Sequence, residues 1–179
     1  MIIEQCSPTL AGLKTANLFP CKYSSREKLW AEIRRFNANY ARKGIRMIPV
    51  KTKGNHALIY LYRPKKLEAD MQNEISLQIL LRFGYRGDNP SSRIAELVRR
   101  FKENDEFPHE IGLFLGYPPE DVRGFIEHRN EGCKCVGCWK VYGDEQYARK
   151  CFENYKKCTR IYREQFAEGK SIERLIVAV

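Results

Sequence analysis

Ile45-Arg46-Met47-Ile48-Pro49-Val50-Lys51-Thr52-Lys53-Gly54-Asn55-His56-Ala57-Leu58-Ile59-Tyr60-Leu61-Tyr62 is the stretch that decides the fold. Its two ends, residues 45–50 and 57–62, are rich in the apolar, β-branched and aromatic side chains typical of strands. The segment between them, residues 51–55, is polar and contains Gly54 and Asn55, which favour a turn. The stretch therefore predicts an antiparallel hairpin, and Pro64 is expected to end its second strand.

Helical patterns surround this hairpin on both sides. A helix is expected from Ser24, which has capping-box spacing with Glu27, to Gly44. Further helices are predicted at residues 67–83 (in two pieces), from 88 through 101, at 108–115, from 118, and as a long helix that starts at Asp144. Residues 136–142 and 172–179 are predicted as strands. The apolar stripes at 29–40, 94–101 and 147–166 should all pack against the sheet. The expected fold is α+β: a single helix-rich domain, residues 1–179, on a small, mainly antiparallel sheet.

The composition limits where the chain can act. A length of 179 residues suits one domain with a substantial core. Apolar runs fall short of the roughly 18 residues that would suggest a transmembrane helix, so no membrane insertion is expected. The N-terminus resembles no signal peptide, which predicts a cytoplasmic protein with reduced cysteines.

Positive charge is concentrated in the N-terminal third. Residues 14–66 contain 14 Lys or Arg and only two acidic residues, Glu27 and Glu32. Such a surface can face an acidic protein, an anionic small ligand or a nucleic acid, or it can simply be a solvated face. The patch in question would comprise Arg34, Arg35, Arg42, Lys43, Arg46, Lys51 and Lys53.

Residues 107–144 contain the highest density of potentially reactive side chains in the sequence. Cys133, Cys135 and Cys138 form a C-x-C-x-x-C cluster, whose thiolates could bind zinc or an iron–sulfur cluster, could remain free thiols or could form a disulfide. A fourth ligand is hard to find. Cys151 and Cys158 are seven residues apart on one predicted helix, hence about 10.5 Å apart along its axis. Both cannot bind one zinc ion, and we expect them to be buried and reduced.

Three residues are candidates for catalysis. Cys6 precedes a short predicted helix with Ser7 as N-cap, a setting that can lower the pKa of a thiol. His109 and Glu110 follow Pro108 and should lie in the first turn of another helix. There Glu110 would favour the helix dipole, while His109 could act as an acid–base group near neutral pH. A structural role is the alternative for each of them, and for His109 and Glu110 it is the favoured one.

Six residues are candidates for ligand binding, and a single cleft could unite the whole set. Polar groups near the first helix could bind an anion such as phosphate. Aromatic and basic side chains of residues 139–142 could stack on a ring, although a half-buried strand gives the same alternation. These candidates are Ser7, Thr9, Lys14, Trp139, Lys140 and Tyr142. We hypothesise that Cys6, Lys14, His109, Glu110 and residues 139–142 converge on one cleft.

Four stretches resemble an uncharacterised family of clostridia and related anaerobes, domain of unknown function 3793. They are Cys6-Ser7-Pro8-Thr9-Leu10-Ala11-Gly12-Leu13-Lys14, Leu58-Ile59-Tyr60-Leu61-Tyr62-Arg63-Pro64, residues 107–122 and Trp139-Lys140-Val141-Tyr142-Gly143-Asp144. The resemblance covers almost the whole chain but implies no activity and no catalytic residue. It implies a setting in anaerobic iron or redox metabolism, because genes of this family lie near those for ferrous-iron transport and flavodoxin.

Three classes of function follow. The favoured one is an accessory protein of anaerobic iron or redox metabolism that binds an acidic protein or anionic ligand through its basic N-terminal third. The first alternative is a thiol- or metal-dependent enzyme that uses Cys6 or the cluster of Cys133, Cys135 and Cys138. The second is a nucleic-acid-binding protein, which the charge permits but no known motif supports.

Overall fold

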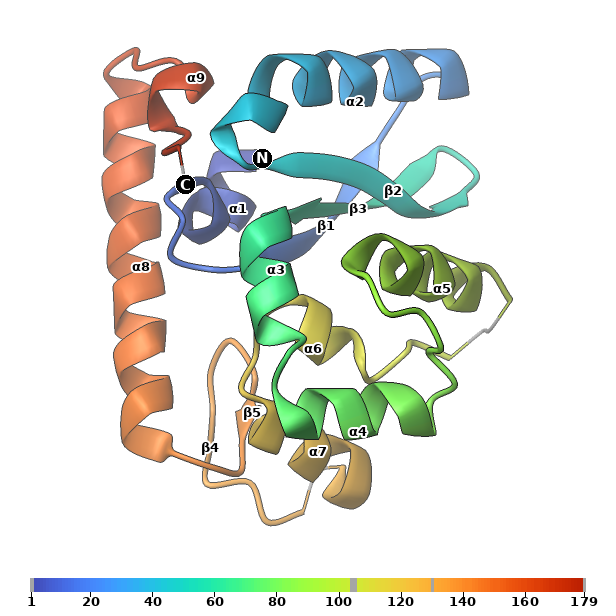
Figure 1. Cartoon of the computed structure of the whole chain (residues 1–179). Helices are drawn as coiled ribbons and strands as arrows, with labels where there is room; N and C mark the ends of the chain where they lie inside the picture. The colour runs from blue at the N-terminus through green and yellow to red at the C-terminus, as the bar shows by residue number, and fades with distance from the viewer. Residues whose placement is uncertain (1, 104–105, 130, 179) are drawn as a thin grey trace.

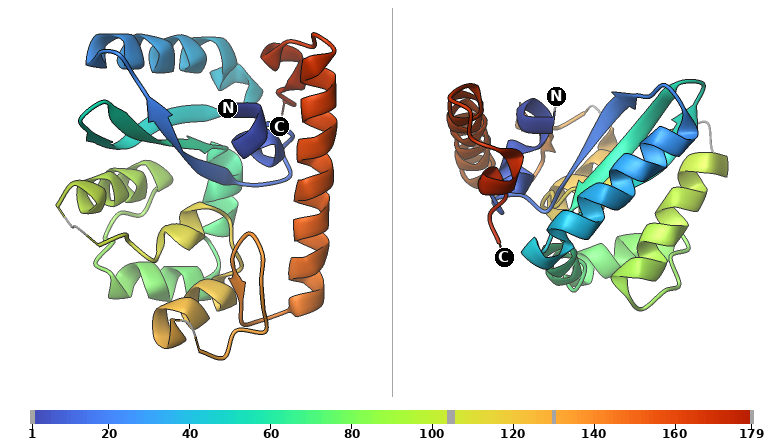
Figure 2. Two further views of the ribbon diagram at one scale, coloured as in Figure 1. Left: turned by 180° about the vertical axis from the view of Figure 1, so that it is seen from behind. Right: turned by 90° about the horizontal axis from the view of Figure 1, so that it is seen from above.

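A computed structural model describes residues 2–103, 106–129 and 131–178 of the chain. Its centre is a three-stranded antiparallel sheet in the order β1-β3-β2, with β1 at Ala16–Lys22, β2 at Arg46–Lys53 and β3 at His56–Tyr62 (Figure 1). The predicted hairpin is thus confirmed as β2 and β3. Helices cover both faces of the sheet, and the α+β class is confirmed (Figures 1 and 2).

Strand β1 was not predicted from the sequence. It pairs with β3 over its whole length, from Ala16 opposite Tyr62 to Lys22 opposite His56. Pro20 interrupts its apolar pattern, and proline cannot donate a ladder hydrogen bond. Because β1 lies at the edge of the sheet, Pro20 is tolerated there.

The alternation of β3 divides the core into two clusters. Ala57, Ile59 and Leu61 pack with α1 (Ile2–Leu10) and α2 (Arg26–Tyr40) on one face. Tyr60 and Tyr62 face the opposite cluster, which is built by the helices that follow β3. A strand that is buried on both faces explains why residues 57–62 are apolar without a polar alternation.

The helices after β3 follow the predicted order. They are α3 (Pro64–Asp70), α4 (Glu74–Arg82), α5 (Pro90–Glu103), α6 (Ile111–Phe114) and α7 (Pro119–His128), and the 3₁₀ helix η1 (Ala41–Lys43) precedes β2. The stripe of α5 is buried as expected, with Leu97 fully inaccessible. Gly44 ends η1 in the left-handed conformation at φ 73°.

The C-terminal third departs from the prediction in three ways. Residues 136–142 form a two-stranded hairpin, β4 (Cys135–Val136) and β5 (Lys140–Val141), instead of one strand. Residues 172–179 contain a short helix, α9 (Ile172–Leu175), where a strand was expected. The long helix α8 (Glu145–Ala167) runs beside α1 rather than on the sheet (Figures 1 and 2).

The prediction that the apolar stripe of α8 is buried was therefore only partly right. Cys158 is buried, but Tyr147 and Phe166 are 56% and 47% exposed. Near the N-terminal end of α8 the buried residues are Ala148 and Phe152, so the buried face there is displaced by one position from the predicted stripe.

Helix α1 begins earlier than predicted. It starts at Ile2, so Ser7 lies inside the helix and its hydroxyl donates to the carbonyl oxygen of Ile3. Cys6 consequently does not precede a helix N-terminus. The Ser-Pro pair predicted a helix start, but Pro8 is the seventh residue of the helix and not its first. Burial of Ile3 and Leu10 holds the helix in place.

Part of the positive charge in the N-terminal third has a structural role. Arg63 is 1% exposed and donates to the carbonyl oxygens of Thr9 (2.6 Å), Leu10 (2.7 Å), Val177 (2.8 Å) and Lys43 (3.3 Å). These contacts join the C-terminal end of α1 to the end of the chain. A guanidinium group suits this place because it offers five donors in a fixed plane.

Among the described residues, no helix combines the length and the apolar character that crossing a bilayer requires.

Candidate functional site

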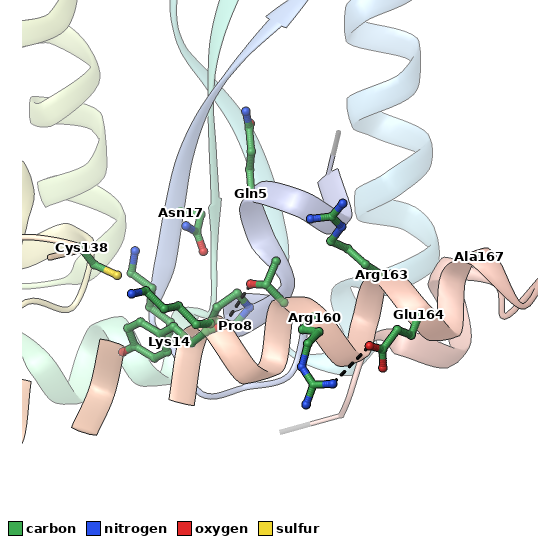
Figure 3. A pocket seen from close by; sticks show the side chains of 12 residues that line it. Gln5, Pro8, Lys14, Asn17, Cys138, Arg160, Arg163, Glu164 and Ala167 are labelled. Carbon is green, nitrogen blue, oxygen red and sulfur yellow. Dashed lines mark hydrogen bonds and ion pairs between the residues drawn. The ribbon is translucent and has the colours of Figure 1, made fainter. Parts of the chain in front are cut away.

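A pocket of about 690 Å³ lies between α1, the start of β1, the β4–β5 hairpin and α8. Figure 3 shows that its side chains come from all four elements, with Lys14 and Cys138 at one end and Arg163 and Ala167 towards the other. Its volume is within the range of small-molecule sites. The long helix α8 supplies seven of the twelve lining residues, so its position beside α1 creates the pocket.

Lys14 is the most unusual residue of this pocket. Its side chain is only 7% exposed, and it makes no hydrogen bond or ion pair with any residue that the structure describes. Its ammonium nitrogen lies 5.2 Å from the centre of the Tyr117 ring, which offers a weak cation–π contact. Buried lysines are normally paired with an acid. The charge of Lys14 is therefore left without a carboxylate partner in this structure.

Burial also changes the proton affinity of Lys14. Desolvation lowers the pKa of Lys14 from 10.5 to about 8, and the thiols of Cys138 and Cys6 act weakly in the opposite direction. At pH 7 the amine remains mostly protonated. The pocket thus holds a positive charge that burial disfavours. An anion beside the amine would compensate for this charge.

Helix α8 adds three cations to the same pocket. Lys156, Arg160 and Arg163 line it and are exposed. Arg160 pairs with Glu164 at 3.3 Å and Arg163 with Glu4 at 3.1 Å, both at the surface, where such pairs are weak. These arginines can exchange their partners for a ligand at little cost. The lining therefore has a clear excess of positive charge.

An amide donor completes the polar part of the pocket. The hydroxyl of Thr9 donates to Oδ1 of Asn17 at 2.7 Å. Because Oδ1 accepts this bond, Nδ2 is the donor group that the Asn17 side chain can offer to a ligand. Thr9, predicted to bind a ligand, is buried and instead orients Asn17, which does line the pocket.

Cys138 reaches the pocket from the turn between β4 and β5. The residue as a whole is exposed, but desolvation of the thiol raises its pKa, ahead of the opposing attraction of Lys14 and Lys156. A thiol with a raised pKa is protonated at neutral pH and is a weak nucleophile.

The structure does not bring the predicted site residues into one cleft. Lys14 lines the first pocket, whereas His109 and Lys140 line a separate cavity. Cys6 is fully buried in the core beside Leu10, and burial raises the pKa of its thiol to about 12. The prediction that a helix N-terminus activates the thiol of Cys6 as a nucleophile was therefore wrong, because Cys6 lies within α1.

Glu110 has a structural environment of its own. It is 1% exposed, and its Oε1 accepts from Nε of Arg100 at 2.7 Å and from the hydroxyl of Tyr85 at 3.0 Å. Oε2 has no hydrogen-bond partner in the described part of the chain. Helix α6 begins only at Ile111, so His109 and Glu110 precede it and do not form its first turn, as had been expected.

Residues 139–142 are fixed by a buried carboxylate that the sequence analysis overlooked. Asp121, on α7, accepts from Nε1 of Trp139 and from the backbone nitrogens of Tyr142 and Gly143, each at 2.7 Å. Trp139 and Val141 are buried together, as the strand alternation predicted. The hydroxyl of Tyr142 donates to the carbonyl oxygen of Arg129.

The thiols of the C-x-C-x-x-C cluster are not gathered around a common point. Within residues 2–103, 106–129 and 131–178, no group of three or more His, Cys, Asp or Glu residues could hold a metal ion. Cys133, Cys135 and Cys138 form no disulfide bond with any residue that the structure describes, and Cys135 packs beside the Trp139 cluster. Cys151 and Cys158 lie on one continuous helix as predicted, with Cys158 buried and Cys151 half-buried.

Sequence reasoning missed the contribution of α8 to the pocket. Lys156, Arg160 and Arg163 follow a spacing of four and three residues, which puts them on one face of a helix. This regular spacing was the available signal. It was overlooked because the excess of positive charge lies in the N-terminal third of the sequence.

The fold and pocket define an α+β protein with a basic, partly buried pocket. A family model described as "Protein of unknown function (DUF3793)" matches residues 2–176, so the chain belongs to that family. No curated protein and no solved structure matches the chain.

Proposed function

We propose that this protein binds a small phosphorylated ligand in the pocket between α1 and α8. The observation that carries the proposal is Lys14, a buried cation without a carboxylate partner among the described residues. A charge in that position costs free energy unless a ligand supplies the opposite charge. The lining favours an anion with more than one negative charge, because Lys156, Arg160 and Arg163 surround the same space.

The size of the pocket favours a phosphate ester over the free ion. Its volume of about 690 Å³ leaves room for an organic group next to the phosphate. Pro8, Tyr155 and Ala167 provide apolar contact surface for that group (Figure 3 shows Pro8 and Ala167). In this arrangement Lys14 and the Nδ2 group of Asn17 hold the phosphate, and the cations of α8 cover it.

The test is isothermal titration calorimetry at pH 7 and low ionic strength, with phenyl phosphate as the probe and benzyl alcohol as its uncharged counterpart. Phenyl phosphate should bind to the wild type, and Lys14→Met should weaken binding at least tenfold, roughly the effect of one buried charge-assisted hydrogen bond. Lys150→Met is the matched control, because Lys150 is an exposed lysine of α8 outside the pocket. Wild-type affinity in Lys14→Met would contradict the proposal.

A second comparison separates the pocket from the basic N-terminal patch. Arg34 and Arg42 are exposed and belong to that patch but not to the pocket. Reversing both charges should change phenyl phosphate affinity only slightly, through long-range effects that salt removes. A loss as large as that of Lys14→Met would instead assign the ligand to the patch. The accessory role in anaerobic iron or redox metabolism, implied by the family resemblance, remains a prediction that neither experiment requires.

One observation favours a thiol-dependent enzyme as a second candidate. Cys138 lines the same pocket as Lys14, so a thiol, an amine and a bound ligand could meet there. Its raised pKa argues against reactivity in the ligand-free protein. Alkylation of Cys138 by iodoacetamide should therefore be slow at pH 7. Fast alkylation that phenyl phosphate blocks would favour the enzyme.

A further inference from the structure

A cavity of about 380 Å³ lies between α1, α2 and α9 on one face of the sheet. Figures 1 and 2 show α1 and α9 beside the end of α2 that leads to β2. Lys43, in the 3₁₀ helix that follows α2, donates to the carbonyl oxygens of Glu173 and Ile176, and these bonds hold α9 in place. Helix α2 supplies seven of the thirteen lining residues, so we call this space the α2 cavity.

The floor of the α2 cavity is apolar. Phe36 and Tyr40 form one side of it, and their rings meet edge to face with centroids 4.9 Å apart. An apolar group of a ligand can therefore leave water here without displacing a protein side chain. Four buried apolar side chains from α2 and the sheet complete the floor: Phe19, Leu29, Ile33 and Ile59.

Apart from the thiol of Cys21, the polar side chains of the lining all come from one flank of α2. They are Glu32, Arg35 and Asn39, which follow a spacing of three and four residues and are exposed. Within the described part of the chain, Glu32 and Arg35 form no ion pair and the amide of Asn39 makes no hydrogen bond. The rim of the cavity thus offers one negative group, one positive group and one amide.

The two opposite charges decide which kind of ligand fits. A simple carboxylic acid that faces Arg35 would also meet the like charge of Glu32, and a simple amine that faces Glu32 would also meet Arg35. A molecule that carries both a carboxylate and an ammonium group satisfies both side chains. We propose that the α2 cavity binds a free amino acid with an apolar side chain.

Each part of such a ligand has a counterpart in the lining. The guanidinium group of Arg35 holds the carboxylate, Asn39 adds a donor, and Glu32 accepts from the ammonium group. The side chain of the amino acid enters the apolar floor, where the volume of about 380 Å³ admits an aromatic ring. The lining shares no residue with the pocket between α1 and α8, and the ligand differs in chemistry from a phosphate ester.

The experiment titrates L-phenylalanine into the full-length protein by calorimetry at pH 7. Two analogues each lack one charge: 3-phenylpropionate has no ammonium group, and phenethylamine has no carboxylate. Both should bind about fivefold more weakly than L-phenylalanine, the effect of one exposed charged contact. L-alanine, which lacks the ring, should bind at least about tenfold more weakly. No binding of L-phenylalanine, or equal binding of any of the three other compounds, would overturn the proposal.

Variants of the rim locate the site. Arg35→Gln and Glu32→Gln should each weaken binding of L-phenylalanine about fivefold. Arg35→Gln should also abolish the preference over phenethylamine, and Glu32→Gln the preference over 3-phenylpropionate. The matched control is Arg34→Gln, because Arg34 is an exposed arginine of the same helix outside the lining. This control and Lys14→Met should both keep wild-type affinity. Wild-type affinity in either rim variant, or a comparable loss in Arg34→Gln or Lys14→Met, would contradict the assignment.

Discussion

Replacing Lys14 with methionine should make the ligand-free protein more stable. The pKa of Lys14 falls from 10.5 in the unfolded chain to about 8 in the fold, because burial disfavours its charged form. Each tenfold loss of proton affinity costs about 1.4 kcal/mol, so the protonated amine destabilises the fold by something on the order of 3 kcal/mol. Methionine has a similar apolar stem and carries no charge. It loses the contact with the Tyr117 ring, which is worth about 0.5–1 kcal/mol.

The expected net gain at pH 7 is about 2 kcal/mol, or roughly 4–8 °C in melting temperature for a chain of this size. The gain should depend on pH in a defined direction. Below pH 8 both the folded and the unfolded chain carry the proton, and the penalty is complete. Between pH 8 and 10.5 only the unfolded chain binds it, so the wild type gains stability relative to the variant as the pH rises. The advantage of Lys14→Met should therefore disappear near pH 10.5.

Urea unfolding followed by far-ultraviolet circular dichroism measures this difference at pH 7 and at pH 10.5. Thiols and phenols also titrate at the higher pH, but they are common to both proteins and largely cancel in the comparison. Lys150→Met, an exposed site, should change the free energy of unfolding by no more than about 0.5 kcal/mol. A Lys14→Met variant that is less stable than the wild type, or equally stabilised at both pH values, would refute the reasoning.

Two further predictions concern residues outside the pocket. Arg63→Met should lower the free energy of unfolding by about 3–5 kcal/mol, since it leaves the buried carbonyl groups of Thr9 and Leu10 and the part-buried ones of Lys43 and Val177 without their charged donor. Arg149→Met, which breaks only an exposed pair with Glu145, should cost about 0.5 kcal/mol, and equal effects in urea unfolding would contradict the structural role of Arg63. Cys6, whose pKa burial raises to about 12, should resist iodoacetamide at pH 8 in the folded protein and react only in urea, as mass spectrometry of the labelled peptides can show.

The parts of the fold that could be predicted are those with local causes. The β2–β3 hairpin follows from its apolar runs and turn residues, and the N-terminus of α8 follows from Asp144, whose side chain accepts from the backbone nitrogen of Tyr147. Strand β1 depends on its partner β3, because its own sequence contains Pro20. The strand predicted near the C-terminus became α9, where Leu175 and Ile176 pack on the α1 cluster.

The candidate site was harder to predict, because it depends on contacts between distant segments. Lys14 was selected from the sequence because it lies near Ser7, where a helix was expected to start. The helix does not start there. Its actual importance comes from burial beneath α8, some 140 residues later in the chain. His109 and Lys140 were expected to join Lys14, yet they meet in another cavity around Phe125. Residue types alone indicate which groups are reactive, while tertiary packing decides which of them meet.

The pKa of Lys14 itself is the most direct test of the proposed pocket. Nuclear magnetic resonance of the lysine side chains, with the Lys14 signal assigned by its absence in Lys14→Met, can follow the titration with and without phenyl phosphate. The account predicts a pKa of about 8 in the ligand-free protein and a clear rise when phenyl phosphate saturates the pocket, because the phosphate stabilises the ammonium form. An ordinary lysine pKa without ligand, or a pKa that phenyl phosphate leaves unchanged, would contradict it.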